Sequence, residues 1–134
     1  MRRAAQTRWH RESGQSLLET AILLIVVFMV VFWIIETGEM VYTYSVLADA
    51  ANEGVRYAIV HSGGDATGTQ TTVKNFAGLS AHNVTGLTAT VTFPDGNANP
   101  PNRVRVSVTY TYVPTLGSFS PTMNTYAEGR MVVQ

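Results

Sequence analysis

Residues 14–35 read GQSLLETAILLIVVFMVVFWII, and this stretch decides the fold of the chain. Its last 16 residues, 20–35, carry no charge and are mostly Ile, Leu, Val, Phe and Met. At about 1.5 Å per residue, a helix over this stretch crosses the ~30 Å hydrocarbon layer of a bilayer. A buried core helix is the alternative, but the roughly 100 residues that follow are polar and glycine-rich and too few to surround a helix that is apolar on all sides. We therefore predict a single transmembrane helix.

The charged residues on either side of this stretch predict its orientation. Residues 1–13 contain four arginines and one glutamate, a local charge of +3, whereas the rest of the chain sums to −3. The first charges after the apolar run are Glu36 and Glu39. Because positive charge stays on the cytoplasmic side, we expect the N-terminus in the cytoplasm and the C-terminal part outside it. Residues 48–50, Ala-Asp-Ala, offer signal-peptidase cleavage as an alternative. We disfavour it because they lie 12 residues beyond Glu36, in a segment predicted to be helical.

The composition argues against several classes of protein. With 134 residues, the chain has room for one small domain and a membrane segment, and is too short for a large enzyme. Its C-terminal cations are not clustered, so no nucleic-acid partner is expected. It has no cysteine, which excludes disulfides and thiolate metal sites. His61 and His82 have no second ligand at metal-binding spacing, and no serine lies in a nucleophile motif. We therefore expect no metal, no cofactor and no enzymatic activity.

Gly14 closes the basic leader, and Glu19 follows five residues later inside the apolar helix. This order, Gly14-Gln15-Ser16-Leu17-Leu18-Glu19, resembles the type IV prepilin signal, in which a membrane aspartyl peptidase cuts after the glycine on the cytoplasmic side. The resemblance implies cleavage between Gly14 and Gln15, with a prepilin peptidase as a partner. Removing the leader would remove the strongest cytoplasmic anchor and let the helix leave the bilayer for a filament.

The N-terminus that such a cut creates would give Glu19 a partner. The α-amino group of Gln15 would be mostly cationic at neutral pH, and positions i and i+4 lie on one face of a helix. A carboxylate costs up to about 2.5–3.5 kcal/mol at mid-membrane and needs a partner there. The pilin resemblance implies that this pairing sets the axial register of an incoming subunit. The alternative is that Glu19 lies at the headgroup level and is simply hydrated.

The transmembrane helix is predicted to continue beyond the membrane. Six residues recur at spacings of three and four and predict one buried face: Met40, Tyr44, Leu47, Ala51, Val55 and Ala58. Gly63-Gly64 is a helix-terminating signal, so we expect a helix over about residues 15–62.

Residues 50–58, Ala-Ala-Asn-Glu-Gly-Val-Arg-Tyr-Ala, carry a more specific resemblance. Together with the junction and the apolar run, they resemble the TadE-like family, pseudopilins of tight-adherence pili. The resemblance covers about residues 11–60. Glu53 and Arg56, at i and i+3, either form only a weak surface ion pair or fix the helix against the head or a neighbouring subunit. In the second case Gly54 would let another backbone approach closely.

The C-terminal residues predict a small α+β head. Residues 71–79 carry Val73, Phe76 and Ala77 at helical spacing and predict a short second helix. Alternating apolar and polar residues predict a hairpin of strands 87–93 and 104–112, then a loop over 113–121 and a third strand over 125–133. An antiparallel sheet of about three strands would bury its apolar face on the helix.

These inferences predict one architecture and one function. The fold class is α+β and membrane-anchored, with a basic leader (1–14), a transmembrane helix (15–36), its extracytoplasmic continuation (37–63) and a head (64–134). The resemblance implies a minor pilin-like subunit of a tight-adherence type IV pilus or secretion system, which acts with other pilin and pseudopilin subunits in pilus assembly and surface adhesion. It also implies a single-pass protein of the bacterial inner membrane that enters a pilus. The alternatives are an uncleaved single-pass protein with an extracytoplasmic binding head and, behind it, a membrane-tethered hydrolase.

Overall fold

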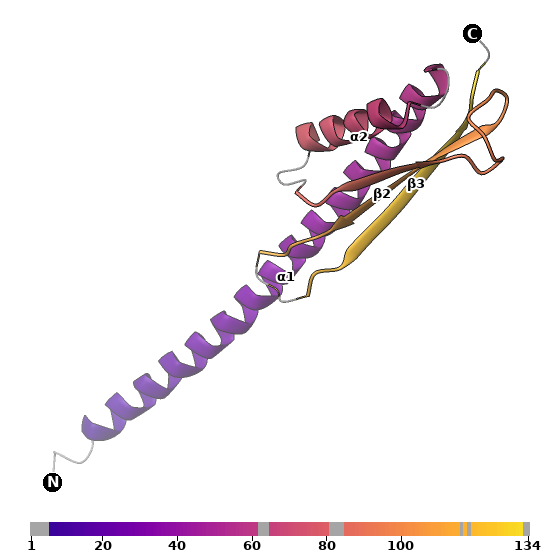
Figure 1. Cartoon of the computed structure of the whole chain (residues 1–134). Coiled ribbons are helices and arrows are strands. Elements are labelled where there is room, and N and C mark those ends of the chain that lie inside the picture. The colour runs from indigo at the N-terminus through magenta and orange to yellow at the C-terminus, as the bar shows by residue number, and fades with distance from the viewer. Residues whose placement is uncertain (1–5, 62–64, 81–84, 116, 118, 133–134) are drawn as a thin grey trace. The chain divides into compact units, whose positions relative to one another are not determined.

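The computed structural model describes residues 6–61, 65–80, 85–115, 117 and 119–132 (Figure 1). Within these residues the chain forms two helices, α1 (Gln6–Val60) and α2 (Ala66–Ser80), and three strands, β1 (Thr88–Thr92), β2 (Arg103–Thr111) and β3 (Thr122–Arg130). The predicted fold class is confirmed: a long apolar N-terminal helix precedes a short helix and three antiparallel strands. The chain divides into two compact units, Met1–Gly38 and Glu39–Gln134, which we describe in turn.

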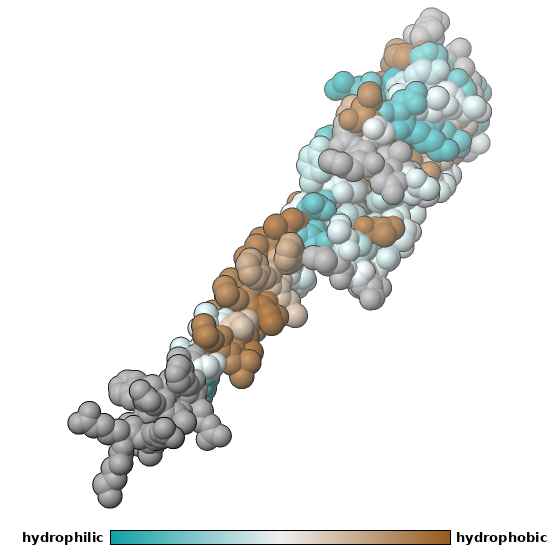
Figure 2. Space-filling model, turned by 90° about the vertical axis from the view of Figure 1, so that its left-hand side faces the viewer, coloured by the Kyte–Doolittle hydropathy of each residue, from teal (hydrophilic) through white to brown (hydrophobic). Residues whose placement is uncertain are grey.

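The first unit contains the N-terminal part of α1, whose apolar side chains are not covered by protein. Over residues 17–35 the large apolar side chains are between 44% (Val31) and 74% (Trp33) exposed. Figure 2 shows them as a hydrophobic surface on the face that it displays. Because water disfavours such a surface on every side of a helix, a lipid environment accounts for it. The helix is long and apolar enough to cross a membrane.

The second unit is built on a sheet with the strand order β1-β2-β3, antiparallel throughout. Val106 of β2 lies opposite Val91 of β1 and Ala127 of β3. Alternate side chains of β2, including Val104 and Val108, are fully buried on this face, as the period of two requires. The predicted hairpin is therefore confirmed.

The third strand begins three residues earlier than the predicted range of 125–133. Thr122, Met123 and Asn124 pair with the last three residues of β2, which extends the ladder to the end of that strand. Two of these three residues are polar, so they carry little apolar alternation, and only the neighbouring strand decides that they are extended.

The part of α1 in the second unit packs mainly small side chains into the core. Leu47, Ala51, Val55 and Ala58 are buried, as the apolar spacing predicts, and Met40 packs against the same core. Tyr44 was assigned to this buried face, and that prediction is wrong, because its side chain is 49% exposed. It lies ten residues, or about 15 Å along the helix, before Gly54, where α2 packs on α1.

The second helix begins earlier than the predicted residues 71–79 because Asp65 caps it. Asp65 Oδ1 accepts a hydrogen bond from the backbone nitrogen of Gly68 at 2.9 Å, the contact of an N-cap residue. The first turn has no large apolar residue, so apolar spacing alone misses it. The predicted terminator Gly63-Gly64 lies outside the described residues, and the described part of α1 ends at Val60.

The sheet of the second unit runs alongside α1. At one end the Tyr112 hydroxyl donates to Glu39 Oε2 at 3.5 Å, and at the other the Val132 nitrogen donates to the carbonyl oxygen of Ile59 at 3.3 Å. The helix rises about 30 Å between Glu39 and Ile59, and an extended strand covers that distance in about nine residues. This is the length of β3, so strand and helix span the same end-to-end distance.

Candidate functional site

Four polar residues share one side of the helix at the N-terminal junction. Gln15 Nε2 donates to Glu19 Oε1 at 3.1 Å, and the Thr20 hydroxyl donates to the carbonyl oxygen of Ser16 at 2.9 Å. At 100° per residue, positions 15, 16, 19 and 20 span about 140° of the helix surface. We call these four residues the polar junction face. Apolar side chains occupy the remaining surface at this level, so the face is the one polar strip that enters the apolar helix here.

The structure places Gln15 and Glu19 together, as their spacing predicts. In the uncut chain the contact is made by the side-chain amide of Gln15, because its backbone nitrogen belongs to a peptide bond. A new α-amino group at Gln15 would lie about 6 Å from Glu19 along the helix axis, within reach of a glutamate side chain. The ion pair after cleavage stays a prediction. Ser16 and Thr20 are the members of this face that sequence reasoning missed, although their positions at i+4 were the available signal.

Gly14 is a helical residue that packing does not require to be glycine. A Cβ atom built there would have nothing within 4 Å, and the residue is exposed. Glycine inside a helix costs about 0.5–1 kcal/mol relative to alanine. The junction is therefore a point at which α1 is easier to unwind locally, with no compensating contact.

Gly54 lies where α1, α2 and β2 meet in the second unit. A Cβ atom on residue 54 would be 2.5 Å from Val73 Cγ2 and 3.2 Å from Val106 Cγ1. Close approach at Gly54 is thus made by side chains of the head rather than by another backbone. A second close approach, which sequence reasoning missed, occurs at Gly129, where a Cβ would lie 2.6 Å from Val55 Cγ1. Glycine inside a strand was its signal.

Glu53 and Arg56 point away from this contact. Arg56 Nη1 lies 3.8 Å from Glu53 Oε2, and the side chains of Arg56 and Glu53 are 79% and 42% exposed, respectively. Such a surface pair contributes little to stability. They border an open groove of about 440 Å³ that is also lined by Asp49, Asn52, Val55 and Phe76. Gly54 therefore lies inside the head, whereas Glu53 and Arg56 are available to another molecule.

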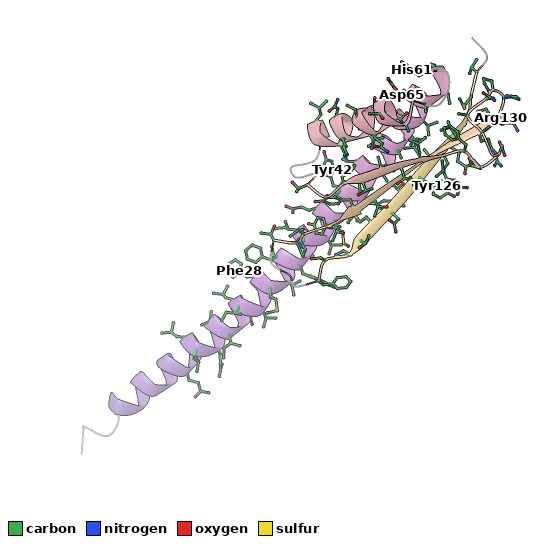
Figure 3. All side chains as sticks on the ribbon, viewed as in Figure 1. Phe28, Tyr42, His61, Asp65, Tyr126 and Arg130 are labelled. Atoms are coloured by element: carbon green, nitrogen blue, oxygen red, sulfur yellow. The ribbon has the colours of Figure 1, made fainter. Side chains whose placement is uncertain are left out.

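A second polar cluster joins the end of α1 to the start of α2. The Tyr57 hydroxyl donates to Asp65 Oδ2 at 3.3 Å, and the Tyr57 ring stacks on His61 with centroids 3.8 Å apart (Figure 3 labels His61 and Asp65). Desolvation, and then the charge and hydrogen bond of Asp65, raise the pKa of Tyr57 above its usual 10.0. Gly68 makes this contact possible, because a Cβ there would collide with both Asp65 and Tyr57.

Charged side chains fix the β1–β2 connection at the far end of the sheet. Asp95 Oδ1 accepts from Arg103 Nη2 at 2.8 Å, and Asp95 Oδ2 accepts from the backbone nitrogen of Arg103 at 2.8 Å. These hydrogen bonds lower the pKa of Asp95 to about 2. Arg105 pairs with Glu128 and lies 5.0 Å from the centre of the exposed Tyr126 ring. These contacts hold the β1–β2 connection on β2, and β2 on β3, so we assign them a structural role.

Side chains that could hold a metal ion are not grouped together elsewhere in the described part of the chain. Among the residues that the structure describes, no three His, Cys, Asp or Glu side chains are placed to hold a metal ion. His61 is engaged with Tyr57, and His82 lies outside the described residues. The junction and the outward-facing pair on α1 are therefore the regions that remain to be explained.

Both regions lie in one segment that is similar to known proteins. The family model described as TadE-like protein matches residues 14–56. This segment is TadE-like. The match begins at the junction glycine and ends at Arg56, so the TadE-like segment includes the polar junction face, the apolar helix and the Glu53–Arg56 pair, and the predicted resemblance is confirmed. No curated protein and no solved structure matches the chain. The TadE-like segment and its apolar helix indicate a single-pass membrane protein.

Proposed function

We propose that the protein is a minor pilin-like subunit, a pseudopilin, of a tight-adherence type IV pilus or secretion system, where it helps the pilus to assemble and to adhere to surfaces. The observation that carries the proposal is the TadE-like match, which starts at Gly14 and takes in the whole apolar helix. The exposed side chains of that helix suit two surroundings in turn, lipid and the helices of other pilin subunits, since both are apolar. The proposed location is the bacterial inner membrane, with the N-terminus in the cytoplasm.

Cleavage by a prepilin peptidase after Gly14 is the first step of the proposed mechanism. A peptidase needs its substrate backbone extended, and the missing Cβ at Gly14 lowers the free energy needed to unwind the helix there. The absence of any packing contact at Gly14 means that this unwinding breaks no tertiary interaction. The cut removes the arginine-rich leader and leaves Gln15 as the N-terminus.

Pairing of Glu19 with the new amine is the second step. Glu19 lies four residues from Gln15 on the polar junction face, so either the amine of the same subunit or that of a neighbour can reach it. Among apolar helices a carboxylate without such a partner is costly, which favours the axial position at which the pair forms. Glu53 and Arg56, which point outward, are proposed to contact a neighbouring subunit.

The intact mass of the membrane-extracted protein tests the cleavage step. With a co-expressed prepilin peptidase, the chain should lose residues 1–14, and without it the chain should stay intact. Gly14→Arg should abolish the cut and leave membrane insertion unchanged. Gly38→Arg is the matched control, because residue 38 is also a helical glycine with nothing within 4 Å of a Cβ, and cleavage should continue. An uncut chain that still supports pilus formation would contradict the proposal and favour the uncleaved membrane protein.

Substitution of Glu19 tests the assembly step separately. Glu19→Ala should be cleaved normally but incorporated less well with partner pilins. The expected loss of about 1–2 kcal/mol in an apolar environment corresponds to roughly 5- to 30-fold. Glu19→Gln keeps the hydrogen bond and removes the charge, so a similar loss would assign the effect to the charge. Thr20→Ala is the control on the same face, since the Thr20 hydroxyl donates to the backbone of its own helix. Normal incorporation of Glu19→Ala would mean that the pairing idea is wrong.

A further inference from the structure

Exposed apolar side chains gather at one end of the second unit. In the connection between β2 and β3, Val113 is 69% and Phe119 is 79% exposed. On α1, Val41 and Tyr42 are 63% and 55% exposed. The connection, residues 112–121, reads YVPTLGSFSP and contains no charged residue. A group of exposed apolar side chains next to an uncharged connection is typical of a surface that meets an apolar or interfacial partner.

One hydrogen bond joins the base of this connection to Glu39, and a second joins the two ends of the connection. The Tyr112 hydroxyl donates to Glu39 Oε2 at 3.5 Å, and the Tyr112 nitrogen donates to the carbonyl oxygen of Pro121 at 3.0 Å. Phe119 is two residues from Pro121, and Val113 directly follows Tyr112. The exposed side chains of the connection therefore start from the same level of α1 as Val41 and Tyr42.

That level is close to the end of the membrane-crossing run. Glu39 is four residues after Ile35, the last residue of the uncharged stretch, which corresponds to about 6 Å along a helix. The polar interfacial layer extends about 5–8 Å beyond the hydrocarbon core on each side of a bilayer. Because only four residues separate Glu39 from Ile35, chain connectivity limits how far the base of the connection can lie from the interfacial layer.

We propose that Val113 and Phe119, together with Val41 and Tyr42, form a second membrane contact that inserts into the interfacial layer of the bilayer that residues 14–35 cross. Tyrosine is enriched in this layer and phenylalanine buries at its boundary with the acyl chains, and the lack of charge in the connection removes the main cost of entering it. The proposal rests on the transmembrane placement of residues 14–35 and not on the pilus function. The contact would hold the unassembled subunit on the membrane and would be lost when the helix leaves the bilayer.

Single-cysteine labelling of the full-length chain tests the contact, because the protein contains no cysteine of its own. Phe119→Cys and Val113→Cys, each labelled with the fluorophore NBD, are reconstituted in phosphatidylcholine–phosphatidylglycerol liposomes that contain doxyl-labelled lipids. Asn97→Cys is the control, because the exposed Asn97 lies beyond the opposite end of β2, about 30 Å away. Labels at 113 and 119 should show blue-shifted emission and several-fold stronger doxyl quenching than the label at 97, and weaker quenching by aqueous iodide.

Two results would overturn the proposal. Equal iodide access at positions 119 and 97 would overturn the proposal. Shielding that grows with the protein-to-lipid ratio and is not quenched by doxyl lipids would assign the surface to a protein contact, and would also overturn it. A dye-free measurement guards against insertion driven by the label: Phe119→Trp, with Trp9 and Trp33 replaced by Phe, should be quenched by brominated lipids. Near-UV circular dichroism checks that each variant is folded, and the mass assay of leader cleavage tests the proposed function independently.

Discussion

Replacing Gly54 with alanine should destabilise the head, because α2 and β2 pack against α1 at this residue. The added Cβ would lie 2.5 Å from Val73 Cγ2 and 3.2 Å from Val106 Cγ1. Both valines are fully buried and stiff about χ1, so neither can swing aside. Overpacking a core costs about 1–3 kcal/mol, and the better helix propensity of alanine offsets about 0.5–1 kcal/mol. The net loss in the free energy of unfolding lies between about 0 and 2.5 kcal/mol, and because neither valine can move we expect about 1–2 kcal/mol.

Thermal unfolding of the full-length protein in detergent, followed by near-UV circular dichroism, measures this loss. In a unit of roughly 100 residues, each 1 kcal/mol shifts the melting temperature by about 4–8 °C, so Gly54→Ala should melt roughly 4–16 °C below the wild type. Gly38→Ala is the matched control in the same helix, because a Cβ there meets nothing within 4 Å. It should be neutral or stabilising by up to about 1 kcal/mol.

A second substitution separates overpacking from any general effect on the helix. Val73→Ala alone removes two buried methyl groups and should cost about 1–3 kcal/mol. In the double variant the methyl group introduced at position 54 occupies part of the space left by the Val73 side chain, so the two losses should fall short of additivity by about 1 kcal/mol. Additive losses, or equal stability of Gly54→Ala and Gly38→Ala, would refute the reasoning.

Two further predictions concern titrating groups of the second unit. The pKa of Asp95 in the folded protein, about 2, lies below its usual 3.8, so its interaction with Arg103 stabilises the fold at neutral pH and is lost as the pH falls from about 4 to 2. The difference in urea midpoint between wild type and Asp95→Asn should shrink over that window, and a difference that stays constant would contradict the assignment. The raised pKa of Tyr57 means that folding favours its neutral phenol, so this contribution is present below pH 10 and is lost as the pH rises through the raised pKa. Asp65→Asn should lower that pKa in an absorbance titration, with Tyr57→Phe identifying the signal, and an unchanged titration would show that Asp65 is not a cause.

Two glycines of the TadE-like segment, Gly14 and Gly54, differ in the physical reason for having no side chain. At Gly54 the packed side chains of the head leave no room for a Cβ, so tertiary structure requires glycine there. At Gly14 nothing is packed nearby, and a glycine is unexplained by the fold. The proposed cleavage supplies a reason, since a peptidase benefits from a backbone that unwinds easily.

The sequence by itself determined the features that depend on local order along the chain. An uncharged run of this length specifies a membrane helix, the glycine-to-glutamate spacing places Gln15 and Glu19 on one face, and alternation specifies the hairpin. These follow from helical and strand periodicity, which need no knowledge of the neighbours. The resemblance to TadE-like proteins was likewise readable from residues 50–58.

Only the tertiary structure decided which neighbours those elements meet. The periodicity of α1 assigned Tyr44 to the core, but the other elements leave its side of the helix uncovered. The start of β3 at Thr122 depends on its pairing with β2, and the inward role of Gly54 depends on Val73 and Val106, which lie far away in sequence. The attachment of the β2–β3 connection to α1 depends on the hydrogen bond between Tyr112 and Glu39, which are 73 positions apart. Contacts of this kind are set by how elements pack in space, and no local pattern of residue types encodes that packing.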